Sequence, residues 1–284
     1  MTLYVLKRLG QGLITVFLLM LVVFVLARLT GDPTFLLVSD WATIEDIAAV
    51  RARFGLDKSY IEQFYIFVRG VLQGDFGTSI FLGRPTLDLF VERLPNTFKL
   101  VVPAVLLGTA CAIPLGVVAA TNRGKLVDRL ATGVAAFGMS APRFWIGLVL
   151  ISIFSVRLGV LPVARMGGIS HYVLPVATIA INLVAAQMRL LRSSMLEVLD
   201  SEYIKLARIK GVSERKVVWW HAFRNSVLTL FTFAAMQLAI MVVGVIVVET
   251  VFAWPGVGRL AYQSIMWRDY PCLLYTSPSP RDRS

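Results

Sequence analysis

The stretch that decides the fold is DSEYIKLARIKGVSERKVVWWHAFRNS, residues 200–226, the most charged run of a strongly apolar chain. Its apolar side chains recur at roughly helical spacing, which predicts a short amphipathic helix, a turn and a second helix. Gly211 falls where a helix would end in a residue of positive φ. Ser213 can cap the next helix, although Lys216 replaces the Glu or Gln of a full capping box. We therefore predict a helical loop with a surface to offer a soluble partner.

The segments on both sides of this loop are apolar and long. The 284 residues are 57% hydrophobic and 16% charged, with a mean hydropathy of +0.74, which is typical of polytopic helical membrane proteins. A spanning helix needs about 20 residues. Five windows meet this need, the third interrupted by Arg143: residues 9–27, 100–122, 130–156, 172–188 and 225–248. The first could be a signal peptide, but its core is too long and no small-x-small cleavage site follows. We expect an all-α bundle of membrane helices.

The distribution of basic residues predicts the orientation of the spans. A formal charge of +11 could indicate nucleic-acid binding, but in a membrane protein excess Lys and Arg marks the cytoplasmic loops. The short turn at 123–129 and the loop at 200–226 are both basic, and the N-terminus carries Lys7 and Arg8. All three are expected in the cytoplasm, which leaves the loop at 157–171 outside.

Residues 31–96 differ from the rest of the chain, with nine acidic and six basic side chains. Two helices of soluble type are predicted here. Thr43 can cap the first, which runs to Phe54, and Ser59 with Glu62 forms a capping box for the second, which ends near Gly74. The net negative charge of this segment places it outside, as a structured extracellular or periplasmic segment between the first two spans.

The chain offers little for catalysis. It contains no G-x-x-x-x-G-K-[ST] run for a nucleotide phosphate. Cys111 and Cys272 form neither a disulfide framework nor a metal site. His171 and His221 have no second ligand at metal spacing and no nucleophile nearby in sequence. We therefore expect no enzyme activity, no cofactor and no metal.

Polar groups inside the spans are the remaining candidates for a functional site. Arg143 lies near the middle of the third window, where an unpaired charge costs at least about 2.5 kcal/mol, so it is expected to face a bundle interior or a water-filled path. The alternative is a kink at the preceding proline and a side chain that snorkels. Asn182, Gln187 and Gln237 could line the same path or join helices by hydrogen bonds. Glu249 is expected at the membrane interface, at the outer end of the fifth span.

Three phrases in and after the charged loop are distinctive: EYIKLARIKG at 202–211, HAFRN at 221–225 and ETVFAWPGVGRL at 249–260. Six shorter phrases precede them: GDP at 31–33, FGLD at 54–57, GDFGTS at 74–79, ERLPNT at 92–97, IPLG at 113–116 and MSAPRFW at 139–145. With these phrases in this order, the chain from residue 1 to about 271 resembles the permease subunits of binding-protein-dependent ABC transporters, in particular the importers of dipeptides, oligopeptides and nickel.

The resemblance implies a role for the charged loop. Ala207 and Gly211 correspond to the Ala and Gly of a loop motif that docks into a cleft on the ATP-hydrolysing subunit. A small Ala allows close approach, Gly211 makes the turn, and the flanking bases meet an acidic groove. Lys205 stands where the wider superfamily often has Glu. The residues that the resemblance assigns to this coupling are Glu202, Tyr203, Lys205, Ala207, Arg208, Lys210, Gly211 and Arg224.

The resemblance also implies the partners and the division of the chain. The partners are ATP-hydrolysing subunits, a second homologous permease chain and an extracytoplasmic substrate-binding protein, in a bacterial inner membrane and without nucleic acid. The chain divides into an N-terminal span (1–30), an external helical segment facing the binding protein (31–96), and a permease domain (97–271). The permease domain contains a cytoplasmic coupling loop at 196–225.

The end of the chain departs from the family. Members continue past the phrase at 268–271 into a sixth span, whereas residues 272–284 read CLLYTSPSPRDRS, which is short, polar and proline-rich. We expect this tail to be foreign, or the product of a truncated or mis-assembled reading frame.

The sequence therefore predicts a permease subunit of an ATP-driven importer that forms half of the translocation pathway for peptides or a similar small solute. The alternative is a stand-alone secondary transporter or channel, which would need coupling charges in several spans and usually an internal repeat. A membrane-anchored receptor built on residues 31–96 would need neither four further spans nor a coupling loop. The sequence does not distinguish among dipeptide, longer peptide, glutathione-like and nickel-chelate substrates.

Overall fold

The structure is a computed structural model, and its regular elements are all helices within the residues that it describes: 2–29, 43–53, 56–79, 81–267, 269 and 272. The chain forms two compact units, one of Met1–Asn96 with Pro255–Ser284 and one of Thr97–Trp254. Helix α5 (Thr86–Thr121) contributes to both. The GDP phrase at 31–33, the predicted helix stop at 54–55 and the tail at 273–284 lie outside the described residues.

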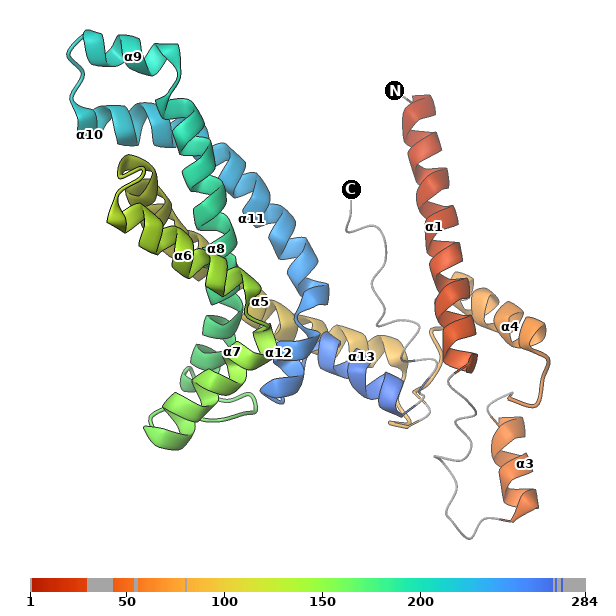
Figure 1. Ribbon diagram of the computed structural model, residues 1–284. Coiled ribbons are helices and arrows are strands. Elements are labelled where there is room, and N and C mark those ends of the chain that lie inside the picture. Colours follow the sequence, from red (N-terminus) through yellow and green to blue (C-terminus); the bar gives the residue numbers. More distant parts are fainter. Residues whose placement is uncertain are drawn as a thin grey trace. The chain divides into compact units, whose positions relative to one another are not determined.

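The first unit contains α1 (Thr2–Leu29), α3 (Ile44–Arg53), α4 (Tyr60–Gln73) and α13 (Val257–Met266) (Figure 1). The predicted capping of α4 is confirmed. The Glu62 amide donates to the Ser59 hydroxyl at 3.3 Å, and Gly74 ends the helix with φ of 78°. Aromatic rings join α1 to α4, with the centroids of Phe24 and Phe64 5.2 Å apart.

The phrase at 74–79 is tied within this unit to the residues after α13. The Ser79 hydroxyl donates to the buried Asp269 carboxylate, and the rings of Phe81 and Trp267 stack with centroids 4.1 Å apart. Leu89, Leu260 and Cys272 form a small buried cluster nearby. These contacts hold together two segments of the first unit that lie about 190 residues apart in the sequence.

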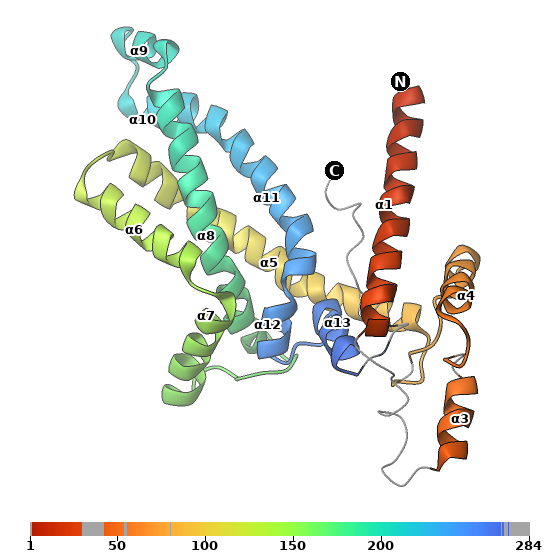
Figure 2. The same ribbon diagram turned by 45° about the vertical axis from the view of Figure 1, so that its right-hand side comes forward.

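The second unit is a bundle of apolar helices (Figures 1 and 2). Its elements after α5 are α6 (Leu126–Ser140), α7 (Arg143–Leu150), the π-helix η1 (Ile151–Arg157), α8 (Ser170–Leu199), α9 (Glu202–Ile209), α10 (Glu214–Lys216), the π-helix η2 (Val217–Phe223), α11 (Arg224–Gly244) and α12 (Ile246–Val251). Helix α8 lies between α6 and α11 and packs against both. Among the described residues, four helices, including α1, are long and apolar enough to cross a membrane, or up to five if a bent pair counts as one span. The predicted fold class is confirmed.

Two of the predicted spans are not continuous helices. In the third window, α6 and α7 meet at 103°. The cause is Pro142, which forces the preceding Ala141 out of the helical region, to φ of −71° and ψ of 126°. In the fifth window, α11 ends at Gly244 and α12 begins at Ile246. The third span is therefore broken, whereas in the fifth window the helix up to Val242 is long and apolar enough to cross a membrane by itself.

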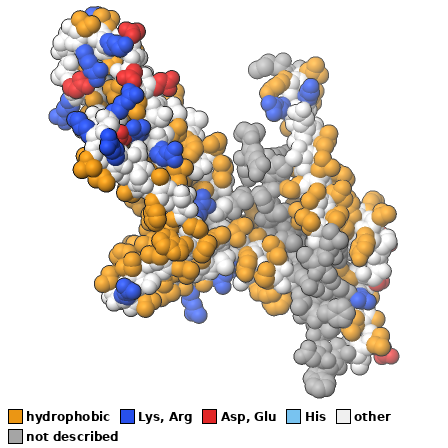
Figure 3. All heavy atoms as spheres, in the orientation of Figure 1, with side chains coloured by type: hydrophobic (Ala, Val, Ile, Leu, Met, Phe, Trp, Pro, Cys, Tyr) orange, Lys and Arg blue, Asp and Glu red, His pale blue; other side chains and the backbone are white. Residues whose placement is uncertain are grey.

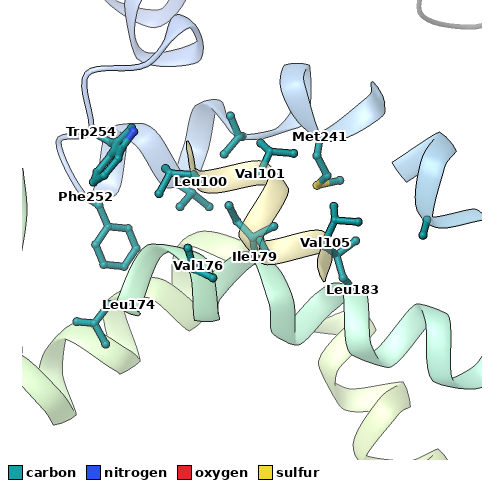
Figure 4. Packing of buried hydrophobic residues seen from close by; sticks show 14 of the residues in the cluster. Leu100, Val101, Val105, Leu174, Val176, Ile179, Leu183, Met241, Phe252 and Trp254 are labelled. Carbon is teal, nitrogen blue, oxygen red and sulfur yellow. The ribbon is translucent and has the colours of Figure 1, made fainter. Parts of the chain in front are cut away.

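The main core lies where α5, α8 and α11 meet (Figure 4). Its members include Leu100, Val101, Val105, Ile179, Leu183 and Met241, all at most 7% exposed. Small residues on α5 allow α8 to approach closely. A Cβ at Gly108 would lie 2.9 Å from Leu183, and one at Gly116 would lie 3.0 Å from Leu191. This is the packing expected of membrane helices, where small residues bring backbones together.

Candidate coupling surface and polar sites in the membrane helices

The coupling loop is built as a short helix between two turns. Ser201 is extended and precedes α9, and Gly211 has φ of 78°. The Gly211 amide donates to the Arg208 carbonyl and the Val212 amide to that of Ala207, which closes the end of α9. Ser213 precedes α10 as predicted, but its hydroxyl makes no capping bond. The second helix of the loop is a single turn that continues as η2.

One side chain fixes α9 to the bundle. Ile204 is fully buried in a cluster with residues of α5, α8, η2 and α11. Leu191 and Met195 of α8 and Val217 of η2 in this cluster are also fully buried. Because α9 is only eight residues long, this anchor couples its position to that of α8 and η2.

The outer face of α9 is apolar and exposed. Tyr203, Leu206 and Ile209 are 45%, 50% and 82% exposed, and Ala207 is half-buried beside them. Lys and Arg side chains gather around this face, at the end of the unit that carries α9 and α10 (Figure 3). The surface thus combines an apolar centre with basic surroundings.

Two of the predicted basic contacts are already paired inside the loop. Lys205 lies 2.7 Å from Glu202, and Arg208 makes a fork onto Glu214 with bonds of 3.1 and 2.7 Å. The hydrogen bond with Glu214 holds the pKa of Arg208 above its usual range, and Glu202 does the same for the pKa of Lys205. These side chains organise the loop itself. In the described part of the chain, Lys210 and the two bases of α10 have no carboxylate partner.

The remaining loop residues join α9 to α11. The Asn225 amide donates to the Tyr203 hydroxyl and to the His221 carbonyl, each at 2.8 Å. The Arg224 guanidinium lies 5.1 Å from the centre of the Trp220 ring. Asn225 was not among the predicted site residues, although it closes the HAFRN phrase.

Two of the four predicted polar residues, Arg143 and Asn182, lie at the break between α6 and α7, and each bonds to different groups there. Arg143 is the first residue of α7 and donates to the Gly244 carbonyl at 2.9 Å, so it joins the broken third span to the end of α11. The Asn182 amide donates to the carbonyls of Gly138 and Ala141, the groups that the end of α6 leaves open. Asn182 therefore joins helices, as its alternative interpretation expected.

The other two predicted residues lie elsewhere. Gln187 is fully buried on α8, and neither its amide nitrogen nor its oxygen has a partner among the described residues. Gln237 is half-buried on α11. The position of Glu249 at the membrane interface stays a prediction, and the structure adds its contacts within the chain. Its side chain is fully buried and accepts a hydrogen bond from Thr97 of α5 at 2.6 Å, and α12 packs on α7 and α8.

Sequence reasoning missed a buried ion pair near the coupling loop. Asp128 is 3% exposed and accepts two bonds from Arg192, at 2.6 and 2.8 Å, and one from the Gly124 amide at 2.9 Å. Arg123 and Asp200 form an exposed pair at 2.8 Å in the same region. The partners are 64 and 77 residues apart, so no local pattern connects them. An acid in an otherwise basic turn was the available signal.

These features define a class of protein: a helical membrane bundle with a broken span, polar groups at the break, and a short charged helix outside the bundle. That class is a transport permease. The family model "Binding-protein-dependent transport system inner membrane component" matches residues 112–277, and "Binding-prot-dependent transport system membrane comp, N-term" matches residues 1–101. The chain belongs to this family of ABC transporter permeases.

Individual relatives agree. The chain is 37% identical over 271 residues to the glutathione transport system permease protein GsiC of Escherichia coli (strain K12), and 38% identical over the same length to GsiC of Salmonella typhimurium (strain LT2). Each match covers 95% of this chain and 89% of the relative. A solved structure described as "Crystal structure of an amino acid ABC transporter with histidines" has a TM-score of 0.54 at 18% identity, covering 67% of this chain and 85% of that one, which is a likeness of fold. The chain is a multi-pass inner-membrane permease subunit of a bacterial ABC importer.

Proposed function

We propose that this subunit forms half of the translocation pathway for peptides or a similar small solute, and that it couples to a separate ATPase through α9 without catalysis of its own. Membership of the family implies an ATPase, a second permease and a binding protein as partners in general. Two relatives are named for glutathione transport, and glutathione is itself a small peptide. A peptide-sized solute fits both the resemblance of the sequence and these names.

The outer face of α9 is the observation that carries the proposal. An exposed apolar patch on a charged loop is the signature of a protein interface. Ile209 is the most exposed of its side chains, and the small Ala207 lies beside Tyr203, one turn before it on the helix. Lys210 and the bases of α10 suit an acidic groove, whereas Lys205 is paired with Glu202 within α9 and Arg208 joins α9 to Glu214 of α10. Ile204 would pass the movement of a docked ATPase to α8.

The solute pathway is assigned to the breaks in the membrane helices. Irregular backbone at membrane depth is tolerated where it is buried in protein or lines a cavity, and broken helices mark binding sites in many transporters. Arg143 and Asn182 lie at such a break. Gln187 on α8 and Gln237 on α11 are proposed as further pathway residues. They would take this role in the complete pore, to which a second permease contributes the other half.

The proposed topology follows the basic loops. The N-terminus, the turn at 123–129 and the coupling loop at 196–225 are cytoplasmic. Residues 1–30 then form the first span, residues 31–96 face the binding protein, and residues 97–271 form the permease domain. Excess Lys and Arg in short loops supports this orientation.

Affinity capture tests the docking. The tagged chain is captured from native membranes in mild detergent, and the retained proteins are identified. The unsubstituted chain, called the parent below, is expected to retain an ATPase subunit and a second permease. The Gly211→Trp variant is expected to lose the ATPase subunit and to keep the second permease. Gly211 has positive φ and open space around it, so the new ring would strain the turn and project from the loop.

Gly159→Trp is the matched control. Gly159 also has positive φ, 64°, and open space, but it lies in the loop at 157–171. The control variant retains both partners if docking uses α9. Retention of the ATPase by Gly211→Trp, or its loss from both variants, would contradict the proposed role of the loop.

A further inference from the structure

Helix α6 is held to α8 near its N-terminal end by the buried ion pair. Asp128 lies in the first turn of α6 and Arg192 in the second half of α8. Arg192 uses two nitrogens on the two carboxylate oxygens, and the Gly124 amide adds a third bond. Such a fork fixes direction as well as distance. Separating it would leave a charge on Asp128 that is only 3% exposed.

Helix α6 is held to α8 a second time at its other end. The Asn182 amide bonds the Gly138 and Ala141 carbonyls, directly before Pro142 breaks the span. Between the two points, Gly138 packs on Ala185, where a Cβ would lie only 3.2 Å away. We name these contacts the α6–α8 tie: Asp128 with Arg192, and Asn182 with the end of α6.

The same helix α8 leads directly into α9. Only Asp200 and Ser201 separate the two, and Ile204 is buried against the end of α8. On the far side of the break, α7 packs on α8 and α12, and its Arg143 donates to the Gly244 carbonyl of α11 at 2.9 Å. Helix α8 thus packs on α6, α7 and α11, and the polar contacts that hold α6 to it lie at the two ends of α6.

We propose that Asp128, Arg192 and Asn182 are positioning residues that carry the movement of α9 through α8 and α6 to the break beside Arg143. The inference rests on the proposed docking of an ATPase at α9. Nucleotide-driven movement of α9 moves α8, and the tie obliges α6 to follow. The break is then the place where the angle between α6 and α7 changes, which alters the Arg143 contact with Gly244 and access to the pathway.

Two cysteine reporters separate docking from transmission. Cys111 is exposed and is replaced by Ala, while Cys272 stays, because burial raises the pKa of its thiol to about 11 and leaves little reactive thiolate. Ile209→Cys reports docking at α9, and Ser140→Cys, exposed at the last residue of α6, reports the break. Labelling by a small water-soluble thiol reagent is measured in inverted native membrane vesicles, with and without ATP and vanadate.

In the parent, we expect nucleotide to change the labelling rate at both positions. Asp128→Asn reduces the change at Ser140→Cys by roughly tenfold, within the range found for substitutions along a coupling route, and leaves protection at Ile209→Cys intact. Arg192→Lys keeps the charge but loses the fork, and gives a smaller loss. Arg123→Gln, which opens the neighbouring pair with side chains 64% and 68% exposed, leaves both reporters unchanged.

The remaining outcomes oppose the inference. A full response at Ser140→Cys in Asp128→Asn would show that the tie does not transmit. If Asp128→Asn abolished the response to nucleotide at both Ile209→Cys and Ser140→Cys, the ion pair would only support the fold. If Asp128→Asn does not assemble, the same two outcomes are read from Arg192→Lys. Absence of protection at Ile209→Cys in the chain with an intact α6–α8 tie would refute the docking itself. This failure is distinguished from failure of the tie because no residue of the tie has been changed.

Discussion

The inner and outer faces of α9 carry the same kind of side chain in opposite surroundings. Ile204 is fully buried in the cluster with α8 and η2, whereas Ile209, five residues later, is 82% exposed. An exposed isoleucine adds no hydrophobic free energy to the fold of this chain, whereas a buried one stabilises the position of the helix. The comparison shows that α9 is fixed by one face and available on the other. The predictions below test that division.

The largest effect is expected from the inner face. Ile204→Ala is expected to destabilise the loop and its contacts by about 2–5 kcal/mol, the range for truncation of a fully buried aliphatic side chain. Ile209→Ala is expected to change stability by less than about 0.5 kcal/mol, as is usual at the surface. Thermal unfolding of the purified variants in detergent measures both. Equal losses would mean that the two faces are not distinct.

The next effect belongs to the outer face. Ile209→Asp places a charge in the exposed apolar patch, and we expect the affinity for the ATPase subunit to fall by roughly 30-fold, the weakening typical of a central interface residue. Stability is expected to stay near that of the parent. Titration of the ATPase onto the solubilised permease gives the affinity.

Ile169→Asp serves as the control for this prediction. Ile169 is 87% exposed, like Ile209, but precedes α8 in the loop that is proposed to lie outside. Unchanged affinity is expected in this variant. If both substitutions weakened binding equally, a general effect of the added charge would explain the result, and the outer face of α9 would lose its special role.

Much of this division could be predicted from the sequence. Gly211 predicted the end of α9, and the apolar windows predicted the spans, because helix period and span length are local properties. The periodic apolar pattern of α9, however, does not say which isoleucine is buried. That depends on where α5 and η2 pack, which is set by residues far away in the chain.

The polar residues show the same limit more clearly. Arg143 was noticed because a charge inside an apolar window is conspicuous, but its partner Gly244 is 101 residues away. Asp128 and Arg192 lie at the ends of apolar windows, where charges are ordinary, so neither attracted attention. Pro142 signalled a kink, but the sequence did not give its size, 103°, or the packing of both α6 and α7 on α8. Local chemistry was readable, and long-range pairing was not.

A smaller effect is expected at the Arg208–Glu214 pair, which closes the loop beside the outer face. Glu214→Gln removes the fork, yet both side chains are well exposed, 42% and 61%, so solvent screens the attraction. The expected loss of stability is at most about 1 kcal/mol, and it is expected to shrink further at high salt. Thermal unfolding at low and high ionic strength measures this. A salt-independent loss would instead indicate that the fork sets the position of Gly211.

The smallest effect is expected at Lys205, which faces solvent next to Glu202. Lys205→Glu restores the residue type that the wider superfamily often has and exchanges the i,i+3 attraction for repulsion. Because Lys205 is exposed and solvent screens its charge, we expect no measurable change in unfolding temperature and unchanged retention of the ATPase. Capture and thermal unfolding, run beside Ile209→Asp, provide the comparison. Loss of the ATPase from Lys205→Glu would move the docking surface from the apolar centre of α9 to its charged border, since a charge at 205 can act on a partner only if that partner reaches it.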